Sequence, residues 1–600
     1  MKKIVSVILA IIIFCSFGCL TGFAADEAIS AFSVGTVEDK EHGAQLCVEW
    51  YEGTDAMYLF VPESINLAEA NVYFEADGDV YADGVKITSG SSADFLAGKS
   101  EVTVSRGNVE YLVKIILISD VSTVFIETES GSLDYVHADK ENKENGEITI
   151  IGADGNVECD GELEYIKGRG NSTWGLDKKP YNIKLEDKEN LFGMGKSKKW
   201  SLLANYSDAS LLRNSLAFTA AENAGMAYTP KFEPVDVYIN GEYMGAYLLT
   251  TRVEVDKTRV NIDNLEDLNE DANPDVEDIE ALPRRGVYGS YSGYFEGTKK
   301  WIEIPNDPED ITGGYVLELE LPGRYADEVS GFVTLNSQPV IFKSPEFASE
   351  NETVYIASYY QLFEDAVYGN KGIDAIGEYC NIDSLVDAYV FNEWVANHDA
   401  GLTSTYLYKP VNDTLYVGPV WDFDRAFGNC DVIRFGIDYN QPSQWTVYKS
   451  LLRNNVIMGD PEVKQIPTFF NLLSKNSDFI ALCEQKWIST YKNAFTAAVE
   501  YITTDYAATI ESSAVANAIR WNAYGTTDIG AIKAEYTKDV KTVAGFADAK
   551  TTFINTNIGT VATYETEDRG FFGGLVDKIS ILAGDLIEKA ILFLGLENVI

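Results

Sequence analysis

Short runs of β-branched, aromatic and other apolar residues dominate the first part of the chain. They lie at residues 45–50, 57–61, 70–74, 101–104 and 111–116, separated by turns rich in Gly and Asp. Such runs, broken by turn residues at short intervals, are typical of strands in an all-β domain. We predict an immunoglobulin-like β-sandwich over residues 26–120 that serves as a spacer or attachment domain, since it shows no catalytic grouping.

The next segment, residues 122–265, mixes strand patterns with one helix pattern. Apolar residues recur at helical spacing from Ser210 to Gly225, and Asp208 precedes them as the predicted cap. Two apolar runs flank Asn240-Gly241, a pair that favours the tight turn of a β-hairpin. The segment is therefore predicted to be β-rich with a single helix.

Beyond residue 350 the patterns are mostly helical. Residues 382–396 predict a long amphipathic helix, and similar patterns cover residues 463–550. Residues 571–600 are also amphipathic, but charges such as Asp585 and Lys589 argue against a membrane-spanning helix. We predict that this C-terminal tail, within residues 551–600, contacts a protein or a membrane surface.

Composition narrows the class of protein. A chain of 600 residues with 46% hydrophobic residues predicts two or three folded domains. A net charge of −46 makes nucleic acid an unexpected partner. Because the chain has only three histidines, a metal site should be rich in oxygen ligands and suit Mg²⁺, Mn²⁺ or Ca²⁺.

The first residues predict export. Met1-Lys-Lys, an apolar stretch over residues 4–15 and small residues before Asp26 together predict a cleaved signal peptide over residues 1–25. Lipidation at Cys19 is the disfavoured alternative, because Ser16 stands where a lipoprotein signal has a Leu-like residue. The mature protein is expected to be secreted or on the cell surface. It keeps cysteines that form no disulfide framework, namely Cys47, Cys159, Cys380, Cys430 and Cys483.

An acidic insertion occupies residues 263–283. Several of its Asp and Asn residues, from Asp267 to Asp278, fall at the offsets of a calcium-binding loop. However, Ala272 stands where such a loop has Gly. Calcium binding therefore competes with a solvated lid or linker, which is the favoured interpretation.

A basic segment interrupts the acidic chain between Tyr165 and Arg213. Its first part, Lys167-Gly-Arg-Gly-Asn-Ser-Thr173, offers glycines for close backbone approach, together with hydroxyls and cations that suit a polyphosphate. A plain glycine turn in a surface hairpin is the competing interpretation. Lys184 follows on a predicted strand, opposite in phase to its apolar neighbours, and is expected to face the same site as the glycine loop.

Three aspartates form the main candidate for chemistry. Asp399 follows the predicted helix 382–396, and Asp422 and Asp424 lie at the end of an apolar run, Val417-Gly-Pro-Val-Trp421. Two aspartates two positions apart on a strand face the same side, and so close a like-charged pair requires a cation or a shared proton. A carboxylate after a helix followed by a carboxylate pair is how phosphotransferases place a catalytic base and a metal ligand. A capping role is the alternative for Asp399.

Other acidic and basic candidates rank lower. Glu318 and Glu320 share one face of a predicted strand and could add a metal ligand. His398 is the sole histidine in a dense motif, and a structural or substrate-positioning role is favoured over a hydrolytic triad. Residues 289–293 do not form a nucleophile elbow, because Tyr291 occupies the central position.

The same segments resemble the CotH family of atypical, spore-coat-type secreted protein kinases. The resemblance covers residues 125–540 in order and spacing. It rests on Lys167-Gly-Arg-Gly-Asn-Ser-Thr-Trp174, Lys179-Pro-Tyr181, Leu191-Phe-Gly-Met194, Lys199-Trp200, Leu202-Leu-Ala-Asn-Tyr206, Leu211-Leu-Arg-Asn214, Gly313-Gly-Tyr-Val-Leu-Glu-Leu-Glu320, Ser344-Pro-Glu346 and Gly418-Pro-Val-Trp-Asp-Phe-Asp424. One departure is Leu249-Thr-Thr-Arg-Val-Glu254, where the family often has a Glu-Gln-like pair.

The resemblance implies an α+β, two-lobed protein-kinase-like fold over residues 121–550, after the immunoglobulin-like sandwich. It implies a kinase that binds ATP with Mg²⁺ or Mn²⁺ and phosphorylates Ser or Thr of a protein substrate. Carried onto this chain, Asp399 resembles the catalytic aspartate, and Asp422, aided by Asp424, resembles the metal ligand. The predicted nucleotide-binding residues are Lys167, Arg169, Asn171, Ser172, Lys179 and Lys184. The alternative is a catalytically weak surface adhesin or coat-assembly scaffold that keeps the fold.

Overall fold

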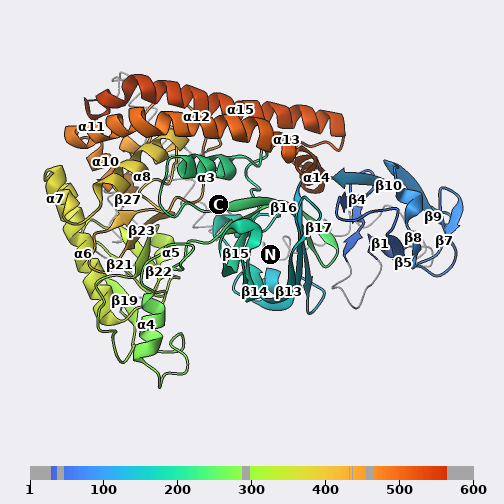
Figure 1. Ribbon diagram of the computed structural model, residues 1–600, viewed down its shortest axis with the longest axis horizontal. Coiled ribbons are helices and arrows are strands. Elements are labelled where there is room, and N and C mark those ends of the chain that lie inside the picture. Colours follow the sequence, from blue (N-terminus) through green and yellow to red (C-terminus); the bar gives the residue numbers. More distant parts are fainter. Residues whose placement is uncertain are drawn as a thin grey trace, which may run out of the picture. The chain divides into compact units, whose positions relative to one another are not determined.

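The computed structural model describes residues 29–36, 46–286, 297–431, 433–434, 437–449, 451–453 and 465–563. The predicted signal peptide, the amphipathic tail over residues 571–600 and residues 289–293 lie outside this part of the chain. It contains both helices and strands, a mixed α+β architecture that confirms this part of the predicted fold class, while the two-lobed kinase-like fold stays a prediction (Figure 1).

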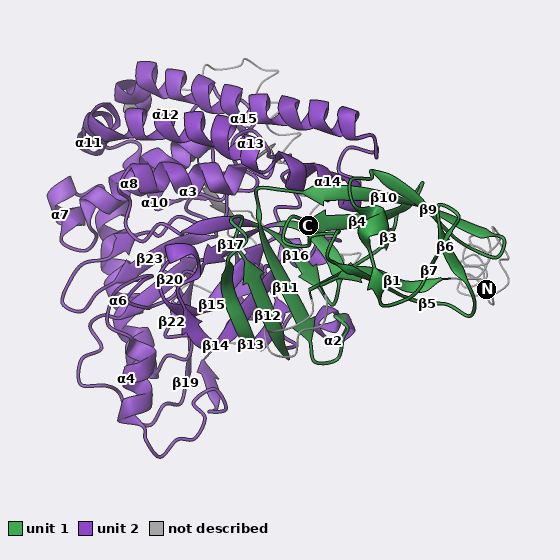
Figure 2. Cartoon of the chain, turned by 45° about the vertical axis from the view of Figure 1, so that its right-hand side comes forward, with its two compact units in different colours: residues 1–133, 145–161, 235–246 green, residues 134–144, 162–234, 247–600 purple. Residues whose placement is uncertain are grey.

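The chain divides into two compact units (Figure 2). Unit 1 comprises residues 1–133, 145–161 and 235–246, and unit 2 comprises residues 134–144, 162–234 and 247–600. All the residues predicted to carry chemistry belong to unit 2.

Unit 1 begins with two β-sheets. Their strands are β1 (Ser30–Gly35), β2 (Cys47–Glu49), β3 (Tyr51–Glu52), β4 (Met57–Pro62), β5 (Asn71–Glu75), β6 (Val80–Ala82), β7 (Val85–Ile87), β8 (Ser91–Ser92), β9 (Glu101–Arg106) and β10 (Val109–Ile118). One sheet has the order β2-β1-β5-β8 and the other β3-β4-β10-β9-β6-β7. Each apolar run of the sequence therefore forms a strand, as predicted. The pairing of β4 with β10 is parallel, and the immunoglobulin-like assignment stays a prediction.

A closed barrel follows in the order β11-β12-β13-β14-β15-β17-β16. Its strands are β11 (Ser122–Thr128), β12 (Glu144–Ile151), β13 (Val157–Gly168), β14 (Tyr181–Glu189), β15 (Ser197–Leu203), β16 (Phe232–Ile239) and β17 (Glu242–Thr251). Asn240 and Gly241 connect the last two with φ angles of 52° and 81°. Positive φ at both positions is what a type I′ hairpin turn requires, so this predicted hairpin is confirmed.

The helix predicted over residues 210–225 starts later than expected. Helix α3 covers Arg213–Asn223, and its N-cap position is Leu212, which makes no side-chain cap. Asn205 and Leu211 have φ angles of 48° and 60°, so the chain turns before the helix begins. Asp208 lies in this turn and not at the N-cap position, but its carboxylate accepts the N–H of Arg213, the first helical residue, over 2.9 Å, so it does satisfy a backbone donor of the helix.

The rest of unit 2 contains a sheet of the order β18-β19-β21-β22-β20-β23-β24. Its strands are β18 (Arg284–Gly286), β19 (Lys299–Ile302), β20 (Tyr315–Leu319), β21 (Gly331–Val333), β22 (Pro339–Ser344), β23 (Thr405–Lys409) and β24 (Tyr416–Val417). Helix α8 (Ile382–Val395) precedes β23, and the side chain of Asn381 caps its first turn. Because Phe391, Trp394 and Val395 are fully buried, this helix lies in the core.

Further helices complete unit 2, and the longest of them is α15 (Ile529–Asn557). The others are α2 (Asp134–Ala138), α5 (Pro322–Tyr325), α6 (Glu350–Tyr368), α7 (Ile373–Gly377), α10 (Phe469–Leu473), α11 (Ser477–Lys486), α12 (Lys492–Tyr501), α13 (Ala507–Thr509) and α14 (Glu511–Trp521). Within the described residues, no helix has the length and apolar character needed to cross a membrane.

The acidic insertion is more ordered than either interpretation predicted. Helix α4 (Leu265–Ala272) occupies its first half, so the earlier positions at calcium-loop spacing lie on a helix and not in a loop. Asn269 is buried and donates a hydrogen bond to Glu352 of α6, 3.2 Å away. The insertion is therefore attached to the fold and is not a fully solvated linker.

Candidate functional site

Asp399 lies in a tight turn just after α8. Ala396 ends the helix in a left-handed conformation with a φ of 54°. The backbone N–H of Asp399 donates to Oδ1 of Asn397 over 2.9 Å, and its carbonyl accepts from the N–H of Leu402 over 2.9 Å. The turn thus fixes the backbone on both sides of the aspartate that was predicted to be catalytic.

His398 contributes to the orientation of the same side chain. Its Nε2 lies 3.3 Å from Oδ2 of Asp399, and its ring is buried with an edge towards the ring of Tyr439. A buried imidazole held between an aromatic ring and a carboxylate suits a positioning role.

Asp422 does not lie on a strand, contrary to the prediction. Strand β24 ends at Val417, and Asp422 has a φ of 70°, in the left-handed region. The alternation of Val420, Trp421 and Phe423 therefore does not reflect strand geometry, and the inference that Asp422 and Asp424 face one side for that reason is wrong. We call residues 422–429 the carboxylate loop.

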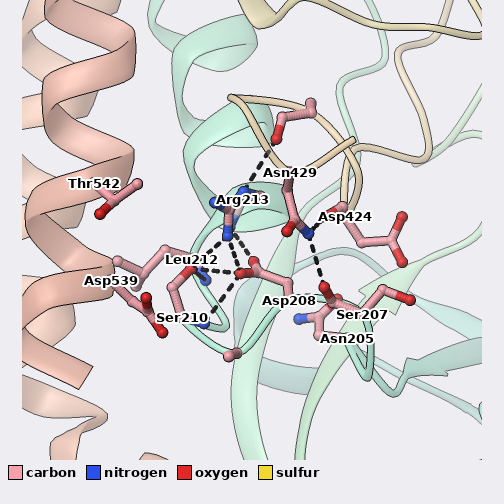
Figure 3. Close-up of polar contacts among 12 residues, drawn as sticks. Asn205, Ser207, Asp208, Ser210, Leu212, Arg213, Asp424, Asn429, Asp539 and Thr542 are labelled. Carbon is pink, nitrogen blue, oxygen red and sulfur yellow. Dashed lines mark hydrogen bonds and ion pairs between the residues drawn. The ribbon is translucent and has the colours of Figure 1, made fainter. Parts of the chain in front are cut away.

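The three aspartates nevertheless lie close enough to interact electrostatically. Asp422 is exposed on one side, but surrounding protein atoms partly desolvate it, and this desolvation and the charge of Asp399 raise its pKa. Ser404 donates a hydrogen bond to Oδ2 of Asp422 over 3.3 Å. Desolvation and the charges of Asp422 and Asp208 raise the pKa of Asp424 to about 7. In Figure 3 the carboxylate of Asp424 points away from Arg213.

These carboxylates fit a divalent cation that is completed by other ligands. Mg²⁺ is usually held by one or two carboxylates together with water and substrate phosphates. Desolvation first, and then the charges of neighbouring aspartates, raise the pKa values of Asp422 and Asp424, and a cation would relieve this repulsion. Among the described residues no group of three or more His, Cys, Asp or Glu side chains is arranged to hold a metal ion alone. The donor set therefore suits a cation that arrives with phosphates.

Arg169, one of the predicted nucleotide-binding residues, interacts electrostatically with Asp422 of this cluster. Its guanidinium stacks over the ring of Trp421, 5.4 Å from the ring centre. Desolvation lowers the pKa of Arg169, while the charge of Asp422 opposes that change. A cation beside Asp422 and on the face of an aromatic ring can bind a phosphate oxygen through several donors.

The other predicted nucleotide-binding residues have local partners. Lys167 pairs with Glu141 over 2.7 Å, and Lys184 pairs with Glu164. Lys179 donates to the carbonyl of Trp174 over 2.9 Å. Asn171 accepts from Lys140 over 3.2 Å, and Ser172 begins the short 3₁₀ turn Ser172–Gly175. Within the described residues, no hydrogen bond or ion pair joins these side chains to the three aspartates.

Glu318 and Glu320, the lower-ranked metal candidates, also have protein partners. Glu320 accepts from Oγ1 of Thr403 over 2.6 Å and from the N–H of Leu321 over 2.7 Å. Glu318 lies 3.7 Å from Nζ of Lys343. Burial raises the pKa of Glu318 to about 8, although Lys343 opposes the shift. Glu320 therefore supports the turn that follows Asp399, because Thr403 lies in that turn.

Several residues around the carboxylate loop were not identified from the sequence as functional. Asn214 accepts a hydrogen bond from the N–H of Phe423 over 2.8 Å, and Arg213 donates from Nε to the carbonyl of Ala426 over 3.0 Å. Arg213 also forms a buried ion pair with Asp208 (Figure 3). Arg213 and Asn214 belong to the motif Leu211-Leu-Arg-Asn214, which was the only sequence signal available for them.

Comparison with known families agrees with the resemblance seen in the motifs. The model of the CotH kinase protein family matches residues 166–554, which is more than half of the chain. The chain therefore belongs to the CotH family, a kinase-like family of the spore coat. A search of curated proteins finds no match to the chain.

Proposed function

We propose that this protein is an exported, metal-dependent protein kinase that transfers the γ-phosphate of ATP to Ser or Thr hydroxyls of an extracellular or envelope protein. The observation that carries the proposal is the meeting of Asp399 with Asp422 and Asp424 beside the guanidinium of Arg169. Family membership supports the reaction type. The signal peptide predicted over residues 1–25 supports export.

Each residue has a distinct role in this proposal. The hydroxyl oxygen of the acceptor forms a bond to the γ-phosphorus as the bond to the β–γ bridging oxygen breaks, and ADP leaves. Asp399 receives the hydroxyl proton, and the turn made by Asn397 and Leu402 holds its backbone in place. Asp422 and Asp424 would hold Mg²⁺ or Mn²⁺, which neutralises charge on the phosphates. Arg169 contributes a second positive charge from the protein.

Lys167 and Lys184 must leave their glutamate partners before they can bind nucleotide phosphates. Lys167 and Lys184 form half-exposed ion pairs with glutamates, and such pairs contribute little to stability. Nucleotide phosphates can therefore compete for these lysines at small cost. Lys179, bonded to backbone carbonyls, would orient the loop over residues 167–175 instead of contacting phosphate.

A purified-protein assay tests the function. The full chain, incubated with γ-labelled ATP, Mg²⁺ or Mn²⁺ and a Ser/Thr protein acceptor, should transfer label, and Asp399→Asn should transfer it more slowly, by about 10²-fold or more. Absence of transfer by the wild-type protein with either metal, despite nucleotide binding, would favour the scaffold function. The many local partners of the lysines are the observation that keeps this second candidate open.

A further inference from the structure

We propose that Arg213 and Asn214 are positioning residues that hold the carboxylate loop in the conformation that binds a divalent cation. This inference rests on the proposed metal site of Asp422 and Asp424. It concerns two residues at the start of α3 that contact the loop through its backbone and not through its carboxylates.

Asn214 holds the centre of the carboxylate pair. Its side chain is 4% exposed, and its Oδ1 accepts the N–H of Phe423, the residue between the two aspartates, over 2.8 Å. Its Nδ2 donates to Oδ1 of Asn205 over 2.9 Å, which fixes the orientation of the amide. The left-handed φ of Asp422 is an unfavourable backbone conformation that must be stabilised from outside the loop.

Arg213 holds the following turn of the loop. The guanidinium is 6% exposed and donates from Nε to the carbonyl of Ala426 over 3.0 Å. Its ion pair with Asp208 is buried, and Asp208 also accepts the N–H of Arg213 over 2.9 Å. Figure 3 shows the guanidinium on one side of the loop and the carboxylate of Asp424 directed to the other side. Arg213 therefore fixes the loop without occupying the carboxylate.

A third contact joins the end of the loop to the same supporting turn. Nδ2 of Asn429 donates to the carbonyl of Ser207 over 2.8 Å and to that of Asp424 over 2.7 Å. The turn over residues 205–212 is in turn braced by Tyr524, whose hydroxyl contacts the carbonyl of Ala209 over 3.2 Å and Asp539 of α15 over 2.8 Å. The loop thus rests on a frame built from α3, this turn and α15.

The frame has a specific consequence for cation binding. Asp399, Asp422 and Asp424 repel one another in the absence of a cation, and a free loop would relax by moving them apart. Backbone contacts that prevent this relaxation order the carboxylate loop when the protein folds. The free-energy cost of ordering the loop then does not reduce the affinity for the cation. Removal of the contacts should therefore weaken cation binding and turnover more than metal-free nucleotide binding.

Two variants of the full chain test the proposal. Asn214→Leu removes the acceptor for Phe423 at similar side-chain size, and Arg213→Lys keeps a positive charge for Asp208 but loses the Nε donor to Ala426. Mn²⁺ is titrated in the presence of excess ATP, because the site is expected to take the cation together with phosphates, and protein-bound Mn²⁺ is followed by electron paramagnetic resonance. The Mn²⁺ concentration for half-maximal phosphotransfer and the affinity for ATP in chelator are measured in parallel. We expect Mn²⁺ affinity to fall about tenfold, the effect typical of supporting residues around a metal site, with ATP affinity in chelator unchanged.

Lys486→Met is the control for a general loss of stability. It breaks the ion pair of Lys486 with Asp387, which does not touch the carboxylate loop, and should lower the melting temperature while leaving Mn²⁺ affinity unchanged. If Arg213→Lys, folded, binds Mn²⁺ as tightly as wild type, Arg213 has only a structural role and the inference is wrong. If wild-type protein with ATP shows no Mn²⁺ binding that Asp422→Ala abolishes, the metal site of the proposed function fails instead.

Discussion

Asp399, Asp422 and Asp424 approach one another from two separate segments, whereas each lysine predicted to bind phosphate has a partner close to it in the fold. Desolvation raises the pKa values of Asp422 and Asp424, and the charges of neighbouring aspartates raise them further. Lys167 and Lys184 are instead paired with Glu141 and Glu164, and Lys179 donates to a backbone carbonyl. In the folded protein the three aspartates therefore carry negative charge that is not fully balanced nearby. The predicted phosphate-binding lysines, in contrast, already have protein partners. A cation would be the first requirement of such a site, and Arg169 the main protein charge available to phosphate.

Asp399→Asn should have the largest effect on this comparison. The amide keeps the size of the side chain but cannot receive the hydroxyl proton, so the rate of phosphotransfer should fall by about 10²-fold or more. ATP affinity should change little. Single-turnover phosphorylation measures the rate, and nucleotide affinity is measured on the same preparation. A wild-type rate in this variant would remove Asp399 from the mechanism.

Asp422→Ala tests whether the acidic half needs a cation. In wild-type protein, ATP should raise the melting temperature substantially more with Mg²⁺ or Mn²⁺ than in chelator, because the cation should tighten ATP binding. A ligand at 100 times its Kd stabilises the folded state by about 2.7 kcal/mol. The variant should lose the metal-dependent part and keep the rest. Thermal denaturation with and without metal gives both values. Equal stabilisation of wild-type protein by ATP in excess chelator would contradict the metal site.

Arg169→Met and Lys184→Ala compare the two kinds of cation in the basic half. Arg169 lies beside Asp422, and its loss should weaken ATP binding with metal about tenfold, in the range of a lost charge-assisted hydrogen bond. Lys184→Ala should weaken binding and turnover as well, but less, since Lys184 must first leave Glu164. Glu164→Gln is the matched control and should strengthen ATP binding slightly. If Lys184→Ala has the larger effect, the strand lysine is the main phosphate ligand.

Glu364 separates burial from carboxylate crowding and should give the smallest effect. Burial raises its pKa to about 7, against hydrogen bonds from Asn336 and Thr334 that lower it. The folded state therefore holds the proton of Glu364 more tightly than the unfolded chain does. This difference stabilises the folded state below the ordinary pKa of a glutamate, and the stabilisation is lost as the pH rises to about 7. Wild-type protein should lose stability between pH 5 and 7 more steeply than Glu364→Gln, as measured by melting temperature.

Two controls accompany that measurement. Glu350→Gln changes an exposed carboxylate at the start of the same helix, away from Glu364, and should leave the wild-type slope unchanged. Mg²⁺ should also leave the Glu364-dependent slope unchanged, because Glu364 lies on α6 with partners at residues 334 and 336 and not in the carboxylate loop. A slope that disappears with Mg²⁺ would mean that the pH dependence arises at the cation site.

Local patterns predicted the elements well where local interactions decide them. The helix predicted over residues 382–396 forms as Ile382–Val395, and Asn240-Gly241 forms the expected turn. The phase of Lys184 on its strand was also right, since Ile183 and Leu185 on either side are buried. These features depend on periodicity, capping and turn chemistry within a few residues.

Contacts between distant residues were beyond the reach of such patterns. The apolar run before Asp422 predicted a strand, but the N–H of Phe423 is taken by Asn214, 209 positions away. Asp208 was predicted as a helix cap, and its carboxylate does accept the N–H of Arg213, but its buried ion pair with the side chain of Arg213 was not predicted. The order of the motifs indicated the site, and only the structure identifies what supports it.

The hydrogen bond from the N–H of Phe427 to the carbonyl of Val395, 2.9 Å long, joins the carboxylate loop to the last residue of α8. The ring of Phe427 is fully buried, with its centre 5.0 Å from that of the Trp394 ring. The loop that carries the proposed cation ligands is therefore in direct contact with the end of the helix that precedes the proposed base. Substitutions on the two sides of this joint should be energetically coupled, so that the effects of paired changes do not add. Substitutions at the end of α8 and in the carboxylate loop should therefore be correlated during evolution.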